Sequence, residues 1–239
     1  MTSSIKHRAL ITGASSGIGK ATALAFAKAG IDVALVSRSQ EKLAEVVTSV
    51  KEIGVEGKAY PLDLAKIEEV KVGIEKIAAD FAPIDILVNN AGIGYTGLLM
   101  DTPLGDWQKV INLNLTSIFQ SIQAILPTLR QQKRGTIINV SSIAGEQTFP
   151  GWGAYSVSKA GLIALSKILA TEERSNGIRV VTICPGAVNT PIWDTVQVEL
   201  NRGAMLTPEI VAQSILHAVL MPESAVIESM TLMPSAGVL

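Results

Sequence analysis

Short apolar runs alternate with longer stretches of helical periodicity, and this alternation restricts the possible fold more than any other feature. The runs that we expect to form strands are 8–12, 32–37, 57–63, 84–90, 135–142, 178–186 and a last run near 225–232. The stretches that we expect to form helices are 18–30, 40–53, 66–82, 104–131, 153–175 and 207–220. Strands that alternate with helices are typical of repeated βαβ units.

Several of these strands, such as "TIINV", are apolar at nearly every position, as expected when helices cover both faces of a parallel sheet. The sequence therefore predicts an α/β, doubly wound fold with a seven-stranded parallel sheet. No linker, charge run or low-complexity tract divides the chain, so we expect one domain over residues 1–239. In such sheets ligands bind beyond the carboxyl ends of the strands.

Composition limits the partners. Charged residues are 17% of the chain and the formal net charge is −1, which does not favour binding to nucleic acid or to an anionic membrane surface. No apolar run approaches the roughly 18 to 20 residues of a spanning helix. A small-molecule partner is expected. The single cysteine, Cys184, and the absence of a signal-peptide core favour the cytoplasm, and the two histidines and one cysteine form no ligand cluster, so no metal is expected.

A glycine-rich stretch, "TGASSGIG" (12–19), follows the first expected strand and opens the first expected helix. Gly13 permits a tight turn, Gly17 allows the backbone to approach a pyrophosphate, and Gly19 allows close packing of the helix. The helix N-terminus supplies free amide groups and a partial positive charge. The same residues match the G-x-S-x-G elbow of serine hydrolases. That alternative is weak, because the only histidines are His7, before the first strand, and His217, in a late amphipathic stretch.

The end of the second strand indicates which nucleotide binds. Proteins of this architecture that bind NAD commonly carry an acidic residue there, whereas this chain has Ser37, Arg38 and Ser39. A guanidinium cannot accept a hydrogen bond from a ribose hydroxyl, but it can pair with a 2'-phosphate. The sequence therefore favours NADP(H), and a solvated loop arginine is the alternative.

Tyr155 and Lys159 are four residues apart at the start of an expected helix, so their side chains share one face. For a phenol to exchange a proton near neutral pH, its pKa must fall by about 3 units, which corresponds to about 4 kcal/mol. One cation about 4 Å away at an effective dielectric constant of about 20 contributes about 4 kcal/mol. We therefore expect Lys159 to lower the pKa of Tyr155.

Taken together, the motifs resemble those of the short-chain dehydrogenase/reductase family. They are "TGASSGIG", "NNAG" (89–92), Ser142 in "NVSSIAG", "YSVSK" (155–159) and "PGAVNT" (185–190), in this order over nearly the full chain. The resemblance implies a Rossmann fold and NAD(P)-dependent interconversion of a carbonyl and an alcohol. Ser16 and Val181 depart from relatives that carry a basic residue or an Asn there, so specificity for NADP rests on Arg38.

The resemblance also implies roles for single residues. Tyr155 would be the general acid, and Lys159 would lower its pKa and hold the nicotinamide ribose. Ser142 would polarise the substrate oxygen, and Asn114 would hold a water molecule in a proton relay. The alternative for Asn114 is a hydrogen-bonded asparagine of the core, and the alternative for Asp63 is the N-cap of the helix that follows it. The implied cofactor-binding residues are Gly13, Ser15, Ser16, Gly17, Ile18, Gly19, Ser37, Arg38, Asp63, Leu64, Asn90, Ala91, Gly92, Tyr155, Lys159, Pro185, Gly186, Val188 and Thr190.

The sequence defines the substrate less closely than the cofactor. Four aromatic residues fall in the loops after the expected fourth, fifth and sixth strands: Tyr95, Phe149, Trp152 and Trp193. They favour an apolar or bulky carbonyl compound as the substrate. The alternative is that they pack within the loops or against another subunit. Segment 190–206 could close over the site as a lid. The alternatives are a 3-oxoacyl-[acyl-carrier-protein] reductase, with Lys133, Arg134 and Arg174 as docking cations, and a non-catalytic NADP(H) sensor.

Relatives usually form dimers or tetramers, so the resemblance implies a homo-oligomer built through 104–131 and 153–175. Apolar side chains on the first of these stretches could serve either the core or that interface: Ile118, Phe119, Ile122 and Ile125.

Overall fold

A seven-stranded, entirely parallel sheet forms the centre of the computed structural model, which describes residues 6–196 and 201–237. The strands are β1 (Arg8–Thr12), β2 (Asp32–Ser37), β3 (Gly57–Pro61), β4 (Ile86–Asn89), β5 (Gly135–Val140), β6 (Ile178–Pro185) and β7 (Ser229–Leu232). Their order across the sheet is β3-β2-β1-β4-β5-β6-β7. The predicted seven-stranded doubly wound sheet is confirmed.

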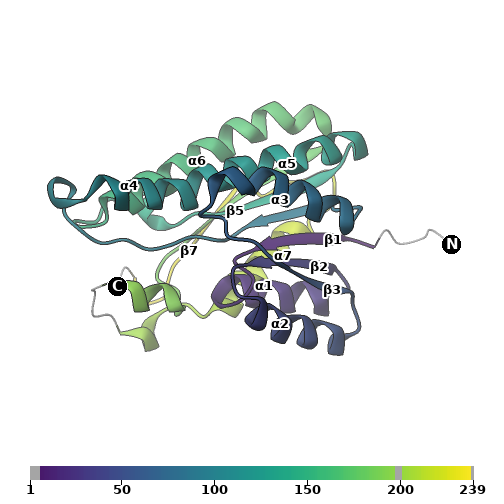
Figure 1. Cartoon of the computed structure of the whole chain (residues 1–239), viewed down its shortest axis with the longest axis horizontal. Coiled ribbons are helices and arrows are strands. Elements are labelled where there is room, and N and C mark those ends of the chain that lie inside the picture. Colours follow the sequence, from purple (N-terminus) through teal and green to yellow (C-terminus); the bar gives the residue numbers. More distant parts are fainter. Residues whose placement is uncertain (1–5, 197–200, 238–239) are drawn as a thin grey trace.

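Helices cover both faces of the sheet (Figure 1). On one face lie α1 (Gly17–Lys28), α2 (Gln40–Ile53) and α7 (Pro208–Val219). On the other lie α3 (Ile67–Asp80), α4 (Leu104–Ile111), α5 (Ser117–Gln132) and α6 (Gly153–Glu173). In the described part of the chain, no helix combines the length and the apolar character needed to cross a bilayer.

Alternate residues of each central strand pack on opposite faces of the sheet, as the pleat requires. In β1, Ile11 belongs to the core beneath α1, α2 and α7, whereas Leu10 belongs to the core beneath α3, α5 and α6. In β2, Leu35 and Val36 divide in the same way. Burial on both faces explains why these strands are apolar at successive positions.

The stretch 104–131 departs from the prediction of one continuous helix. It divides into α4 and α5, which are joined by a π-helical turn at Asn112–Thr116. Such turns insert an extra residue into a helix and frequently occur at functional sites. The π turn contains Asn114, whose side chain is fully buried. Ile118, Ile122 and Ile125 of α5 are also core residues, whereas Phe119 is 43% exposed.

Several strands are shorter than predicted. β3 ends at Pro61 rather than 63, and β7 begins only at Ser229 rather than near 225. After Pro61, the backbone N–H of Leu62 still donates to the carbonyl oxygen of Ser37 at the end of β2, whereas the N–H of Lys66 donates to the carbonyl oxygen of Asp63 in a turn. The chain therefore changes from sheet pairing to a turn between residues 62 and 66.

Candidate active site

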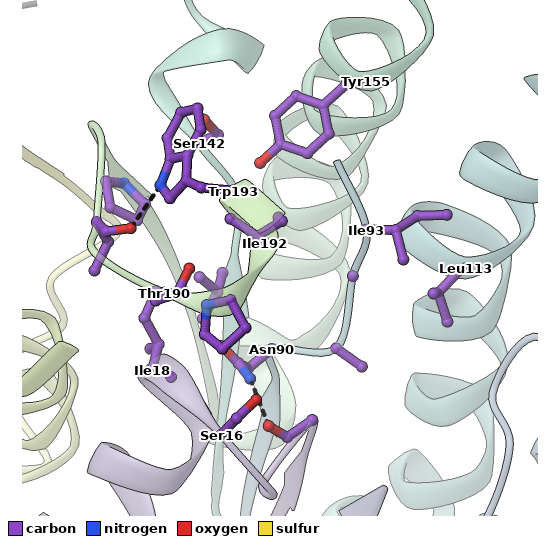
Figure 2. A pocket seen from close by; sticks show the side chains of 18 of the residues that line it. Ser16, Ile18, Asn90, Ile93, Leu113, Ser142, Tyr155, Thr190, Ile192 and Trp193 are labelled. Atoms are coloured by element: carbon purple, nitrogen blue, oxygen red, sulfur yellow. Dashed lines mark hydrogen bonds between the residues drawn. The ribbon is translucent and has the colours of Figure 1, made fainter. Parts of the chain in front are cut away.

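A cavity of about 820 Å³ opens at the carboxyl ends of the strands. The chain runs outward from β1 through β2 to β3 and returns to the other side of β1 as β4, so strand order reverses between β1 and β4. The cavity lies at this switch point, where the loops after β1 and β4 separate. Figure 2 shows the side chains of these loops facing the same space.

The structure brings together nearly all of the residues expected at the site. Those that line the cavity are Gly13, Ser15, Ser16, Gly17, Ile18, Ser37, Arg38, Asp63, Leu64, Asn90, Ala91, Gly92, Ser142, Tyr155, Lys159, Pro185, Gly186, Val188 and Thr190. Gly19 and Asn114 are not part of the lining and lie behind it. The roles of all these residues stay predictions, because a shared cavity shows proximity and not chemistry.

The glycine loop is held against the end of β4. The side-chain amide of Asn90 donates to the carbonyl oxygen of Thr12 at 3.0 Å, and the Thr12 hydroxyl accepts from the backbone N–H of Asn90 at 3.0 Å. Gly13 has φ +65°, and a Cβ there would lie 2.8 Å from Asn90 Nδ2. A side chain at this position would therefore be strained and would clash. The loop leaves its open side toward the cavity.

Two cations line the end of the cavity beyond β2. Arg38 follows the strand directly, and Lys42 lies in the first turn of α2, whose N-cap hydroxyl on Ser39 accepts from the backbone N–H of Lys42 at 3.4 Å. Neither side chain forms an ion pair with any described residue. Lys42 was not predicted; its place in the first turn of the expected helix that follows Arg38 was the available signal. Asp63 follows β3, the strand next to β2, and its carboxylate accepts from the backbone N–H of Ala65 at 3.1 Å rather than capping α3.

Tyr155 and Ser142 form the polar centre of the opposite end. Tyr155 extends from the first turn of α6 into the cavity, and Figure 2 shows its hydroxyl directed toward Ser142 and Trp193. The Ser142 hydroxyl accepts from the backbone N–H of Ala144 at 3.1 Å, which orients it, and it lies within hydrogen-bond reach of the Tyr155 hydroxyl. Two hydroxyl groups can therefore reach one substrate oxygen.

The expected effect of Lys159 on Tyr155 is not what the structure shows. Burial raises the pKa of Tyr155, and a hydrogen bond with Ser142 lowers it by less. The ammonium nitrogen of Lys159 lies 5.7 Å from the centroid of the Tyr155 ring and donates to the carbonyl oxygen of Val140 at 2.9 Å. Burial also lowers the pKa of Lys159 to about 8. Desolvation outweighs attraction, because both groups lie in the interior.

Three hydrogen bonds hold the side chain of Asn114. Its amide oxygen accepts from the backbone N–H of Ile93 at 2.9 Å, and its amide nitrogen donates to the Ile93 carbonyl at 2.9 Å and to the Ser158 hydroxyl at 3.1 Å. A Cβ on Gly92 would lie 3.1 Å from Asn114 Oδ1 and 3.6 Å from Lys159 Nζ. Gly92 thus lets the β4 loop pass between the two side chains.

The predicted aromatic lining holds in part. Phe149, Trp152 and Trp193 line the cavity, but Tyr95 does not, because its ring packs within its own loop against Gly97. The lining also includes several residues of the predicted lid, namely Thr190, Pro191, Ile192, Trp193 and Val196. Residues 197–200 of that segment lie outside the described residues. Apolar lining that sequence reasoning missed includes Ile93, Leu113, Ile143 and Met233. These residues come from separate segments, so no local pattern marked them.

Both histidines lie away from the cavity lining. His7 is bonded to Asp85 before β1, at the opposite end of the sheet, and His217 is exposed on α7. Ser15 therefore has no histidine partner, and the serine-hydrolase alternative fails.

Comparison with known proteins agrees with this geometry. The family described as short chain dehydrogenase matches residues 7–201. The 3-oxoacyl-[acyl-carrier-protein] reductase FabG of Thermotoga maritima is 40% identical over 217 residues, which are 87% of each chain. A 3-oxoacyl-[acyl-carrier-protein] reductase of Synechocystis is 41% identical over 201 residues, which are 83% of this chain and 81% of that one.

Two solved structures share the fold. An alcohol dehydrogenase from the archaeon Thermococcus sibiricus, complexed with 5-hydroxy-NADP, superposes with a TM-score of 0.89, 28% identity and 97% coverage of both chains. A metagenomic short-chain oxidoreductase in complex with NADP superposes with a TM-score of 0.84, 30% identity, and 96% and 97% coverage. The chain belongs to the short-chain dehydrogenase/reductase family of oxidoreductases.

Proposed function

We propose that this chain is an NADPH-dependent carbonyl reductase that reduces a ketone or an aldehyde, with Tyr155 as the general acid. One observation carries the proposal: a single cavity joins a glycine loop and Arg38, which pairs with no described carboxylate, at one end to the Ser142, Tyr155 and Lys159 side chains at the other. This arrangement suits a long dinucleotide with its reactive ring beside a proton donor.

The residues present fit NADP(H). Gly13 and Gly17 have φ of +65° and +51°, so the loop can turn its backbone amides toward a pyrophosphate at the start of α1. Arg38 and Lys42 would hold a 2'-phosphate. The end of β2 carries no carboxylate at the position where an acidic residue favours NAD. The two structural relatives named above were solved with NADP or a derivative of it.

When bound, NADPH would supply the hydride. Ser142 would donate a hydrogen bond to the substrate oxygen, and Tyr155 would donate its proton to the oxygen as negative charge develops there. A raised pKa keeps the Tyr155 hydroxyl protonated at neutral pH, so the residue is ready as a donor. This state suits reduction better than oxidation, which needs a base.

Lys159 and Asn114 would restore that proton. Lys159 has a pKa of about 8, close enough to neutral pH to gain and lose a proton readily. Asn114 and Gly92 lie beside its amine, as the contacts of Gly92 show. We propose that Lys159 passes a proton to Tyr155 after each turnover, and that Asn114 helps to hold the water that supplies it.

A 3-oxoacyl-[acyl-carrier-protein] reductase is the second candidate, because relatives at 40% identity carry that name. An acidic carrier needs a basic docking surface. Of the cations expected there, Arg174 is paired with Glu228 at 2.7 Å and Arg134 lies 3.9 Å from Asp85. These internal pairs reduce the free positive charge, so we place the free carbonyl compound first.

The test is NADPH consumption with a panel that contains simple ketones, aldehydes and acetoacetyl thioesters. Turnover of the free compounds supports the first candidate, and turnover restricted to carrier-bound thioesters supports the second. Nucleotide binding without turnover of any carbonyl compound would instead support a non-catalytic NADP(H) sensor.

We also propose a homo-oligomer, dimer or tetramer, because apolar side chains remain exposed on α5 and α6, namely Phe119, Val157 and Ile168. Light scattering that shows only monomer would contradict it. A cytoplasmic location fits Cys184, a buried free thiol.

A further inference from the structure

Three aromatic rings stand side by side at the substrate end of the cavity. The ring centroid of Trp152 lies 5.3 Å from that of Tyr155, with an angle of 66° between the ring planes, and 5.8 Å from that of Trp193, with an angle of 73°. Trp152 is therefore steeply inclined to both neighbours. The three rings form one continuous aromatic wall, which includes the proposed proton donor.

Different contacts position the two tryptophan residues. Trp193 lies in the 3-10 turn Pro191–Thr195, and its ring N–H donates to the carbonyl oxygen of Val188 at 2.8 Å (Figure 2). Trp152 is the N-cap of α6, and its backbone forms a parallel bridge with Gly97 in the loop after β4. The Trp193 ring is thus bonded directly to the backbone, whereas the Trp152 ring packs edge to face against Tyr155 and Trp193.

The position of the two hydroxyl groups places a substrate against this wall. A carbonyl oxygen that accepts from Tyr155 and Ser142 must lie within about 3 Å of both oxygens. The groups attached to the carbonyl carbon then lie only a few bond lengths from the aromatic rings. Further side chains around this space are apolar and contribute no charge: Phe149, Ile192 and Val196.

Flat ring faces at fixed angles favour a flat partner. Aromatic pairs gain energy beyond the area they bury when they stack or meet edge to face, whereas a puckered aliphatic ring gains only the burial. We propose that the substrate is a ketone or aldehyde that carries an aromatic ring on or next to its carbonyl carbon, and that Trp152 and Trp193 select it. This inference rests on the proposed function and names its substrate class.

The experiment compares acetophenone with cyclohexyl methyl ketone, which have the same number of carbons but differ in the flatness of the ring. We expect kcat/KM with NADPH to favour the aromatic ketone by about tenfold, since two ring contacts are involved. W193A should reduce this preference to less than about threefold, mainly through a higher KM for acetophenone. W193F keeps a ring and should retain a clear preference.

Two controls keep the result interpretable. Trp107 lies on α4 and does not line the cavity, so W107F should leave the preference unchanged. NADPH binding, followed by nicotinamide fluorescence without any ketone, should stay within about twofold in W193A, which shows that the variant is folded.

Equal turnover of the two ketones by the unmodified protein would overturn the inference and leave the proposed function standing. An unchanged preference in W193A would also overturn it. NADPH binding without turnover of any carbonyl compound would overturn both proposals.

Discussion

The side-chain nitrogen of Lys159 donates to the carbonyl oxygen of Val140 at 2.9 Å, which connects α6 to the end of β5 beneath the cavity. This amine is buried, and burial lowers its pKa to about 8 from an ordinary value of 10.5. The folded protein therefore keeps a charged group where charge is disfavoured. A residue held at such a cost is a candidate for function rather than for stability.

Replacing Lys159 with Met should stabilise the fold while abolishing turnover. The pKa difference corresponds to about 3 kcal/mol at neutral pH, from which the lost hydrogen bond to Val140 removes about 1 kcal/mol. We expect K159M to raise the free energy of unfolding by about 1 to 2 kcal/mol at pH 7 in denaturant titration. Lys167 is exposed on the same helix, so K167M should have little effect.

The gain in the free energy of unfolding in K159M should decrease as pH rises. Below pH 8 the lysine is protonated in both the folded and the unfolded states, and the cost of the buried charge is complete. Between about pH 8 and pH 10.5 the folded protein releases the proton first, so the stability of the unmodified protein rises with pH. The advantage of K159M should therefore shrink as pH rises and disappear before pH 10.5, where only the lost hydrogen bond to Val140 remains and costs about 1 kcal/mol. A difference that grows with pH would contradict a lowered pKa.

Removing the Tyr155 hydroxyl should remove turnover without removing the nucleotide. General acids contribute about a hundredfold or more to rate, so Y155F should lower kcat by at least about a hundredfold. NADPH affinity, measured by fluorescence titration, should change less than about threefold. Y95F is the matched control, because Tyr95 does not line the cavity. Near-normal turnover in Y155F would exclude this residue as the acid.

Arg38 and Lys42 should distinguish NADPH from NADH. Hydrogen bonds to charged groups are worth about 1.5 to 3 kcal/mol, so R38A should weaken NADPH binding by about tenfold or more and leave NADH binding unchanged. K42A should have the same selectivity and a smaller effect. Lys51, exposed near the end of α2, provides K51A as the control. Equal losses for both nucleotides would show that these cations do not contact a 2'-phosphate.

Asn114 should be a major stabilising residue of the π turn. N114A would leave the N–H and the carbonyl of the half-buried Ile93 without their partner, which should lower the free energy of unfolding by about 1 to 3 kcal/mol. Asn112 begins the same turn but bonds only to Gln108 near the surface, so N112A should cost less than about 1 kcal/mol. Similar losses of unfolding free energy in both variants would contradict a specific stabilising role for the bonds between Asn114 and Ile93.

Local sequence determined the architecture of this protein. The alternation of apolar strands with helical stretches predicts the seven-stranded parallel sheet, because strand and helix periodicity depend on near neighbours. The motifs at the strand ends, such as "TGASSGIG" and "YSVSK", predicted the composition of the cavity, because carboxyl ends of parallel strands meet at one edge. Tyr155 and Lys159 were found in this way.

Only the tertiary structure decided the electrostatics and the fine geometry. Spacing placed Lys159 one helical turn from Tyr155, but burial by other segments sets the pKa of both groups, and burial does not follow from spacing. The π turn that contains Asn114 is accompanied by bonds from its side chain to Ile93, which lies in another loop. The wall of Trp152 and Trp193 likewise joins residues from separate segments. Such contacts arise only when distant parts of the chain pack together, and no local pattern encodes them.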